Sequence, residues 1–98
     1  MAGRAELTAL QERFRDAVAD LGVGEVVSYG EIARRAGRPG AARAVGGFLA
    51  EHGGDLPWWR VVRADGRLAP HKPVDQARRL RAEGVDVEGG RVLDALPD

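Results

Sequence analysis

The stretch VVSYGEIARRAGRPGAARAVGGFL, residues 26–49, contains the pattern that decides the fold. Ser28 is followed three residues later by Glu31, which is the spacing of a capping box at the start of a helix. In such a box the serine side chain bonds a free backbone N–H of the first turn. The sequence therefore predicts a short helix that begins after Ser28 and runs to about Ala36.

A second helix is expected directly after the first. Gly37 suits the end of a helix, because glycine readily adopts the left-handed backbone found there. Pro39 suits the first turn of a new helix, where its missing N–H costs nothing. Apolar residues then continue at helical spacing to Leu49. Two helices joined by a tight Gly/Pro turn predict a helix-turn-helix.

The flanking segments predict further helices and a small β wing. Apolar residues at spacings of three and four, proline starts and Asp-Gly or Gly-Gly turns carry these predictions. The expected elements are a helix over 5–21, a hairpin over 58–68 around Asp65-Gly66, a helix over 73–84 and a hairpin over 85–93. The predicted fold class is mostly α with a small β wing, winged helix-turn-helix-like, in one domain spanning residues 1–98.

Charge is distributed unevenly along the chain although the net charge is zero. Residues 29–81 hold eleven Lys and Arg against five Asp and Glu, and the two flanks hold four against ten. The middle of the chain is thus the candidate phosphate-facing region of a DNA-binding domain. Fourteen arginines beside one lysine are also what a GC-rich coding sequence produces, so a single arginine carries little weight.

The residue inventory excludes several kinds of chemistry. The chain has no cysteine, which excludes thiolate nucleophiles and thiolate metal sites and fits a reducing cytoplasm. Its only aliphatic hydroxyls are Thr8 and Ser28, and Ser28 is already the expected helix cap. His52 and His71 show no metal-ligand spacing and are expected in exposed loops. We expect no metal, no cofactor and no membrane segment.

Arg43 is the most informative residue of the second helix. Its neighbours on that helix are small: Ala41, Ala42, Ala44, Gly46 and Gly47. Such a face can lie flush against a nucleic-acid groove, and a protruding planar guanidinium can enter a base stack. The alternative is ordinary helix packing with one solvated arginine.

Trp58 and Trp59 are the most unusual pair in the chain. Neighbouring residues of a strand point to opposite faces, so one indole should enter the core and the other a cavity or solvent. Simple core packing is the alternative, because tryptophan contributes much of the buried area in small domains.

Three motifs together resemble one known family. Val26–Ala33, Ala42–Gly47 and Pro57–Val62 are similar to the C-terminal domain of O6-alkylguanine-DNA alkyltransferases, over about Phe14 to Gly84. Catalytic members have Pro-Cys-His-Arg where this chain has Pro57-Trp58-Trp59-Arg60, so the alkyl-accepting thiolate is replaced by an indole. The resemblance therefore points to the alkyltransferase-like branch of the family.

The resemblance implies roles for named residues. The helix with Arg43 would enter the minor groove, Arg43 would replace the flipped base, and Tyr29 would push the neighbouring phosphate. The implied DNA-binding set is Tyr29, Ala41, Ala42, Arg43, Ala44, Gly46 and Gly47. The implied lesion pocket is Tyr29, Trp58, Trp59, Arg60, Val61, His71 and Lys72, with the Val61 carbonyl reading the guanine amino group. Ser28 and Glu83 would give structural support, and Glu83 would lack the histidine partner that Trp59 replaces.

The expected function is recognition without turnover. By resemblance, the protein would bind double-stranded DNA containing O6-alkylguanine as a cytoplasmic monomer, flip the lesion and mark it for nucleotide excision repair. Alternatives are a winged helix transcriptional regulator or a nonspecific DNA-binding module. A residual enzyme using Glu51 or Glu83, and a protein-interaction domain built on the tryptophan pair, also stay open.

Overall fold

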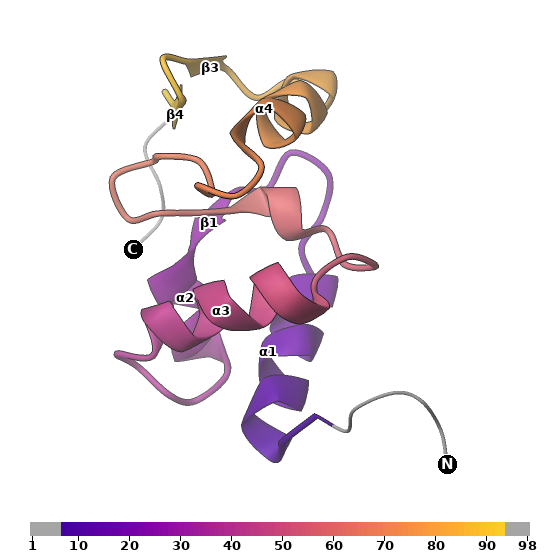
Figure 1. Cartoon of the computed structure of the whole chain (residues 1–98), viewed down its shortest axis with the longest axis vertical. Helices are drawn as coiled ribbons and strands as arrows, with labels where there is room; N and C mark the ends of the chain where they lie inside the picture. Colours follow the sequence, from indigo (N-terminus) through magenta and orange to yellow (C-terminus); the bar gives the residue numbers. More distant parts are fainter. Residues whose placement is uncertain (1–6, 94–98) are drawn as a thin grey trace.

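Four helices dominate the architecture, in a computed structural model that describes residues 7–93. In chain order the elements are α1 (Ala9–Ala19), β1 (Val27–Ser28), α2 (Tyr29–Arg35), α3 (Ala42–His52), a 3₁₀ helix η1 (Trp58–Arg60), β2 (Val61–Val62), α4 (Pro73–Ala82), β3 (Val87–Glu88) and β4 (Arg91–Val92). Helices α1 to α3 form one part of the molecule, α4 and the β3–β4 hairpin form another, and β1 runs between them (Figure 1). The predicted class, mostly helical with short strands, is confirmed.

Helix α1 is shorter than the sequence pattern predicts. Thr8 caps it with a complete capping box, in which its hydroxyl accepts from the Gln11 N–H at 3.1 Å and the Gln11 side chain accepts from the Thr8 N–H at 3.0 Å. This cap fixes the start at Ala9, and the helix ends at Ala19 rather than at residue 21. Residues 5 and 6 of the predicted helix lie outside the described residues.

The cap of α2 forms as predicted. The Ser28 hydroxyl oxygen accepts from the Glu31 N–H at 3.0 Å, and the helix ends at Arg35, with Ala36 as its cap. The Glu31 carboxylate does not complete the box and instead pairs with Arg34 and, at 2.8 Å, with Arg35. Only half of the expected capping box is therefore present.

The turn between α2 and α3 ends one helix as predicted but starts the next one later. Gly37 has φ +83°, and the Gly37 and Arg38 N–H groups bond the carbonyls of Arg34 and Ala33, which closes α2. The prediction that Pro39 occupies the first turn of the next helix is wrong. Gly40 follows it with φ +91°, which no α-helix contains, so α3 begins only at Ala42.

The predicted hairpin over 58–68 is wrong in its pairing. The Asp65-Gly66 turn forms, with the Gly66 N–H bonded to the Arg63 carbonyl at 2.8 Å. Strand β2, however, pairs in parallel with β1, and Arg67 bridges Arg91 of the C-terminal hairpin. Gly66 is needed there, because a Cβ at this position would lie 3.0 Å from the Val92 carbonyl oxygen.

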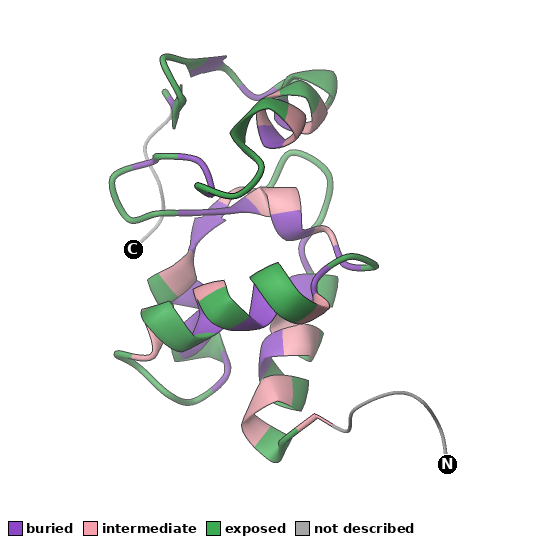
Figure 2. Cartoon of the chain, in the orientation of Figure 1, coloured by how far each residue is buried: buried purple, intermediate pink, exposed green. Residues whose placement is uncertain are grey.

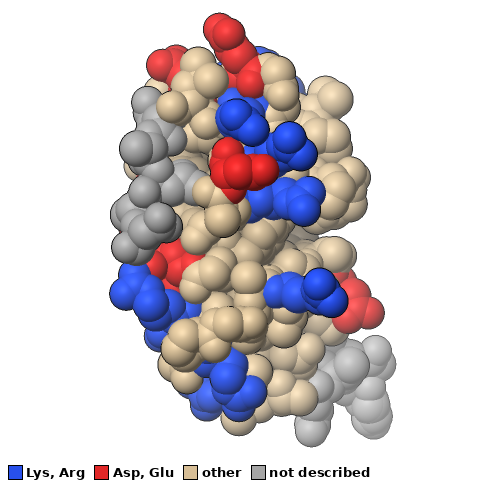
Figure 3. All heavy atoms as spheres, turned by 90° about the vertical axis from the view of Figure 1, so that its left-hand side faces the viewer, with Lys and Arg blue, Asp and Glu red and all other residues tan. Residues whose placement is uncertain are grey.

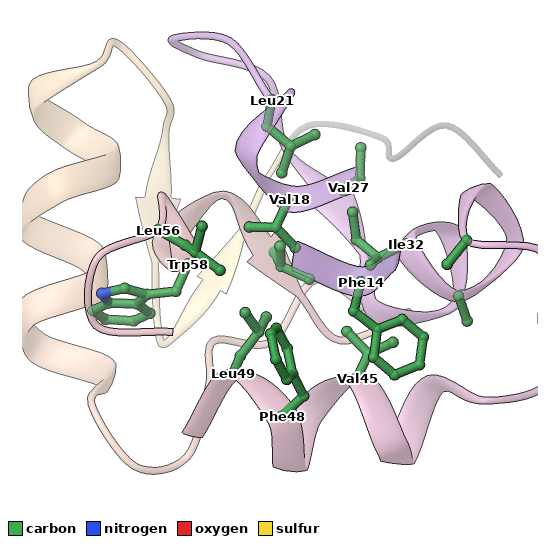
Figure 4. Packing of buried hydrophobic residues seen from close by; sticks show 13 residues of the cluster. Phe14, Val18, Leu21, Val27, Ile32, Val45, Phe48, Leu49, Leu56 and Trp58 are labelled. Carbon is green, nitrogen blue, oxygen red and sulfur yellow. The ribbon is translucent and has the colours of Figure 1, made fainter. Parts of the chain in front are cut away.

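Two apolar clusters meet around η1 and β2. The larger lies between α1, α2 and α3 and includes Phe14, Ile32, Phe48 and Trp58 (Figure 4). The smaller joins β2, α4 and the β3–β4 hairpin, and Trp59 packs against both clusters. Each helix turns its buried residues to these clusters and its exposed ones to solvent (Figure 2). Within residues 7–93, no helix is long and apolar enough to cross a membrane.

Candidate nucleic-acid interface

Helix α3 has one buried face and one smooth outer face. The buried residues are Val45, Phe48 and Leu49, which anchor the helix in the larger cluster. The outer face consists of exposed Ala44 and Gly47 and half-buried Ala41, Ala42 and Gly46. Arg43 is exposed on this face and makes no hydrogen bond or ion pair with any residue between 7 and 93. The predicted arrangement of one free guanidinium on a face of small residues is therefore present.

Tyr29 lies at the edge of this face. It is the first residue of α2, and a Cβ built on Gly46 of α3 would lie 4.0 Å from a carbon of the Tyr29 ring. Burial raises the pKa of the Tyr29 phenol, and nearby Arg63 partly opposes that shift. The phenol thus keeps its proton at neutral pH and can approach a phosphate without charge repulsion.

Basic side chains predominate on the side of the molecule that carries the turn between α2 and α3. Figure 3 shows Lys and Arg above and below a mostly uncharged middle, with fewer Asp and Glu. Arg34, Arg38, Arg43 and Arg63 are all exposed. The outline in this view is also indented between the part that contains α4 and the part that contains α1 to α3 (Figure 3). An approach of DNA from this side would meet positive charge first.

The two tryptophans lie on a 3₁₀ helix rather than on a strand. Trp58 is 7% exposed and belongs to the larger cluster, and Trp59 is half-buried. Their rings meet edge-on, with centroids 6.1 Å apart and planes at 87°. The predicted division holds for Trp58, which is buried in the larger cluster, but not for Trp59, which packs against both clusters instead of facing a cavity or solvent. The Trp58 indole points out of the cluster toward α4 (Figure 4).

The loop before α4 brings further predicted pocket residues to Trp58. The His71 ring lies 5.9 Å from the Trp58 ring, and the Lys72 amine lies 5.4 Å from its centroid. Arg79 of α4 was missed by the sequence reasoning. Its guanidinium carbon lies 6.0 Å from the Trp58 ring centroid and 4.7 Å from the Trp59 ring centroid. Arg79 is one of several arginines on α4, and no sequence signal distinguished it from its neighbours.

Glu83 is the polar centre beside Trp59. Its carboxylate accepts from the Trp59 indole N–H at 2.8 Å, from the Arg60 guanidinium at 2.8 Å and from the Gly24 backbone N–H at 2.8 Å. Glu83 was expected to lack its histidine relay partner, and the Trp59 indole N–H is its hydrogen-bond partner instead. An indole N–H does not release its proton, so the arrangement holds Trp59 in place without forming a proton relay.

The same contacts weaken the case for a residual enzyme. The hydrogen bond from Arg60, followed by those from Gly24 and Trp59, lowers the pKa of Glu83 to about 2 against the opposing effect of burial. A carboxylate that holds its proton so weakly is a poor general base at neutral pH. Its oxygens are also already engaged by three neighbouring groups.

Gln76 organises the backbone around the site, and sequence reasoning missed it. It is fully buried on α4, and its side-chain oxygen accepts from the Ala69 N–H at 2.6 Å. Its amide donates to the carbonyls of Trp59 at 3.1 Å and Val61 at 2.9 Å. The Val61 carbonyl, implied to read the guanine amino group, therefore already accepts one hydrogen bond. A guanine in the pocket must share that carbonyl with Gln76.

The two histidines differ from one another. His71 is exposed in a loop as predicted. His52 is not, because it is the last residue of α3 and half-buried, with its ring 5.6 Å from that of Phe48. Among the described residues, no group of three or more histidines and acidic side chains is placed to hold a metal ion.

Comparison with known proteins identifies the family. Residues 9–85 match the family model described as "6-O-methylguanine DNA methyltransferase, DNA binding domain". The DNA base-flipping protein of Escherichia coli K12 is 42% identical over 87 residues, which cover 85% of this chain and 67% of that protein. Alkyltransferase-like protein 1 of Schizosaccharomyces pombe is 36% identical over 78 residues, covering 74% of this chain and 72% of that protein. The chain belongs to the alkyltransferase-like branch of this family.

The fold agrees with a solved member of the same branch. The crystal structure of S. pombe Atl1 in complex with damaged DNA containing O6-carboxymethylguanine superposes with a TM-score of 0.76 and 29% identity. The match covers 95% of this chain and 93% of that one. This chain has an indole, Trp58, where the catalytic Pro-Cys-His-Arg motif has its acceptor cysteine, and it contains no cysteine. It therefore has no thiolate that could take an alkyl group from DNA.

Proposed function

We propose that this alkyltransferase-like protein recognises O6-alkylguanine in double-stranded DNA by flipping the damaged base, and leaves the alkyl group in place. The observation that carries the proposal is Arg43, which is exposed on the smooth outer face of α3 and has no hydrogen-bond or ion-pair partner among residues 7–93. A face of small residues can enter the minor groove closely, so that the guanidinium reaches the base stack. Trp58 replaces the acceptor thiol and leaves binding as the function of the site.

The physical cost of flipping falls where the base is damaged. An alkyl group at O6 disrupts pairing with cytosine, so the lesion starts closer to the extruded state than intact guanine does. Extrusion costs a few kcal/mol and least for a weakly paired base, which supplies part of the selectivity. Tyr29, beside α3, would press on the adjacent phosphate, and Arg43 would fill the gap that the base leaves in the stack.

The relatives support the same assignment. E. coli has a protein of this kind named for DNA base flipping, and S. pombe Atl1 was solved with O6-carboxymethylguanine in damaged DNA. The transcriptional-regulator alternative fits less well, because the outer face of α3 between Ala42 and Gly47 offers no side-chain donor or acceptor besides Arg43 with which to read base edges.

Removal of the alkyl group must then fall to other proteins. We infer that the bound and bent DNA is passed to nucleotide excision repair, and that the protein acts as a monomer associated with the nucleoid in the cytoplasm. Excision of an O6-alkylguanine duplex by repair extracts, with and without this protein, tests the handover. Unchanged excision would contradict it.

Fluorescence anisotropy tests the recognition itself. Matched duplexes carry guanine or O6-methylguanine at one position, and each is titrated at two salt concentrations while tryptophan emission is followed. We expect tighter binding of the lesion duplex together with a change in emission as the base reaches Trp58. Arg43→Ala should reduce lesion affinity by about tenfold or more, on the scale of a removed charge-assisted contact.

A matched control separates base flipping from general charge. Arg78→Ala removes one exposed positive charge from α4 instead of α3. It should lower affinity for both duplexes slightly and equally. Equal binding of damaged and undamaged DNA by the wild type would reduce the protein to a nonspecific DNA binder, and no binding at either salt would exclude DNA as its ligand.

A further inference from the structure

Two positive side chains lie close to the ring of Trp58. Lys72 and Arg79 both lie within about 6 Å of its ring centroid, and the His71 ring lies 5.9 Å away. We call Lys72 and Arg79 the cationic rim. Lys72 is the residue before α4 and Arg79 lies on α4, the helix toward which the Trp58 indole points (Figure 4). A pocket for purely apolar alkyl groups would not require cations at this place.

The acidic groups nearest to the rim do not neutralise it. Glu83 is engaged by Arg60, Trp59 and Gly24. Asp75 pairs with Arg79 at 3.2 Å but also with Arg78, so one carboxylate serves two guanidinium groups. Lys72 is exposed and forms no ion pair with any described residue. The rim therefore carries an excess of positive charge beside the indole.

We infer that the cationic rim makes the protein prefer O6-alkylguanines whose substituent ends in a carboxylate over neutral substituents of the same shape. The inference rests on the proposed function, because it requires the flipped base to enter beside Trp58. S. pombe Atl1 was solved with a carboxymethyl lesion. The preference for a charged over a neutral substituent of the same shape is inferred from Lys72 and Arg79 of this chain.

Relative magnitudes decide the direction of the effect. A cation over an indole at an exposed site contributes about two- to fivefold to an equilibrium constant. A substituent that enters over Trp58 must displace Lys72 from this position. A carboxylate replaces the lost contact with a charge-assisted hydrogen bond, which contributes about ten- to a hundredfold. A neutral amide can accept a hydrogen bond but carries no charge, so its contact with the cations is weaker. The acid should therefore bind about tenfold more tightly than the amide.

The test uses two lesions that differ in charge and hardly in shape. Duplexes carry guanine, O6-carbamoylmethylguanine or O6-carboxymethylguanine at the same position, and anisotropy gives the ratio of acid to amide affinity. For the wild type we expect a ratio of about ten. Lys72→Met and Arg79→Met keep the apolar stems and should bring the ratio toward one, with a much smaller effect on the amide duplex.

Arg81→Met is the matched control. Arg81 lies on α4 two residues after Arg79 and is exposed, but it bonds the Val87 carbonyl instead of Asp75. It should keep the wild-type ratio, which excludes a general effect of charge. A wild-type ratio of one, with both lesions bound better than guanine, would overturn the preference and leave the proposed function standing. A ratio that survives both rim substitutions would overturn the assignment to the rim. Binding that does not distinguish either lesion from guanine would contradict the proposed function, and the preference with it.

Discussion

Trp59 stands where the catalytic motif has a histidine. Its indole forms a hydrogen bond with Glu83 but cannot transfer a proton. In this chain the indole N–H donates to Glu83 at 2.8 Å, and the guanidinium groups of Arg60 and Arg79 lie 5.3 Å and 4.7 Å from the centroid of its ring. A histidine at this position could carry a proton to and from a carboxylate, but an indole N–H only donates. The site thus keeps its architecture and has lost both the thiolate acceptor and the relay.

Glu83 makes this network sensitive to acid. Its pKa is about 2 in the folded protein against an ordinary 4.5, chiefly because of the hydrogen bond from Arg60. A depressed carboxylate pKa stabilises the folded state fully above the ordinary value, and this contribution is lost as the pH falls from about 4.5 to about 2. We therefore expect wild type to exceed Glu83→Gln in unfolding free energy at pH 7, with the difference shrinking across that window.

Urea denaturation of both proteins between pH 7 and pH 2 measures the difference. Glu31, Asp65 and Asp75 also have lowered pKa values, so both proteins should lose stability in acid. Only the difference in unfolding free energy between the two proteins reports the contribution of the Glu83 charge. A gap that stays constant with pH would show that the loss in the variant comes from packing and not from the charge.

In helix α3, one residue that lowers helix stability suits the proposed contact with DNA. Gly47 has φ in the ordinary helical region, and a Cβ built on it meets nothing within 4 Å. Glycine inside a helix costs about 0.5–1 kcal/mol relative to alanine, because it loses more backbone freedom on folding. A glycine here is explained by the outer surface of α3, where even a methyl group would separate the helix from a groove.

Gly47→Ala should therefore change stability and binding in opposite directions. We expect the free energy of unfolding to rise by about 0.5–1 kcal/mol in urea denaturation. Affinity for O6-methylguanine duplex should fall several-fold in the anisotropy assay, since close approach is hindered. Ala50→Ser, an exposed change later on α3, serves as the control for surface substitution in this helix. Unchanged DNA affinity in Gly47→Ala would place this part of α3 outside the interface.

Element boundaries were predictable where a local side chain determines them. The Ser28 hydroxyl and the Gly37 backbone each act within a few residues, and both features were read correctly from the sequence. The Pro39 start failed because the positive φ of Gly40 follows it, which propensity alone does not reveal. The parallel pairing of β1 with β2 was missed because it joins residues 34 positions apart through packing, as in Val27 with Val61.

The residues of the candidate site also fall into two groups, those that the sequence predicts and those that only the folded structure reveals. Arg43 and Trp58 stood out by motif and composition, and the structure places Arg43 on the smooth face and Trp58 beside His71 and Lys72. Gln76 and Arg79 were missed because their roles depend on which residues α4 meets after folding. The bond between Trp59 and Glu83 likewise spans 24 positions, so only the folded geometry reveals it.

At the scale of the whole molecule, two apolar clusters are joined by a few polar contacts. Trp59 packs against both clusters, and Gln76 of α4 bonds the backbone at Ala69, Trp59 and Val61. Trp58, Trp59 and Val61, which the resemblance assigns to the lesion pocket, lie along this junction. Their geometry therefore depends on how firmly the part with α4 is attached to the part with α1 to α3.

Gln76→Leu should weaken that attachment. Leucine fills a similar volume but leaves the Ala69 N–H and the carbonyls of Trp59 and Val61 without this partner, in a region where Gln76 is fully buried. Buried polar groups that lose their partners cost about 1–3 kcal/mol, so we expect a loss of about 2–4 kcal/mol in unfolding free energy. Urea denaturation followed by far-ultraviolet circular dichroism and by tryptophan fluorescence measures both the size and the cooperativity of the change.

The two signals separate the clusters, because both tryptophans lie at the junction and most α-helical residues belong to α1, α2 and α3, which surround the larger cluster. In the wild type both should give one transition. If Gln76 couples the clusters, the Gln76→Leu fluorescence midpoint should fall below the circular dichroism midpoint, since the pocket loosens before α1 to α3 unfold. Gln11→Leu, at the start of α1, removes a side-chain hydrogen bond far along the chain from the junction and should shift both midpoints together. Coincident transitions in Gln76→Leu would show instead that the whole described fold unfolds as one unit, with Gln76 contributing stability alone.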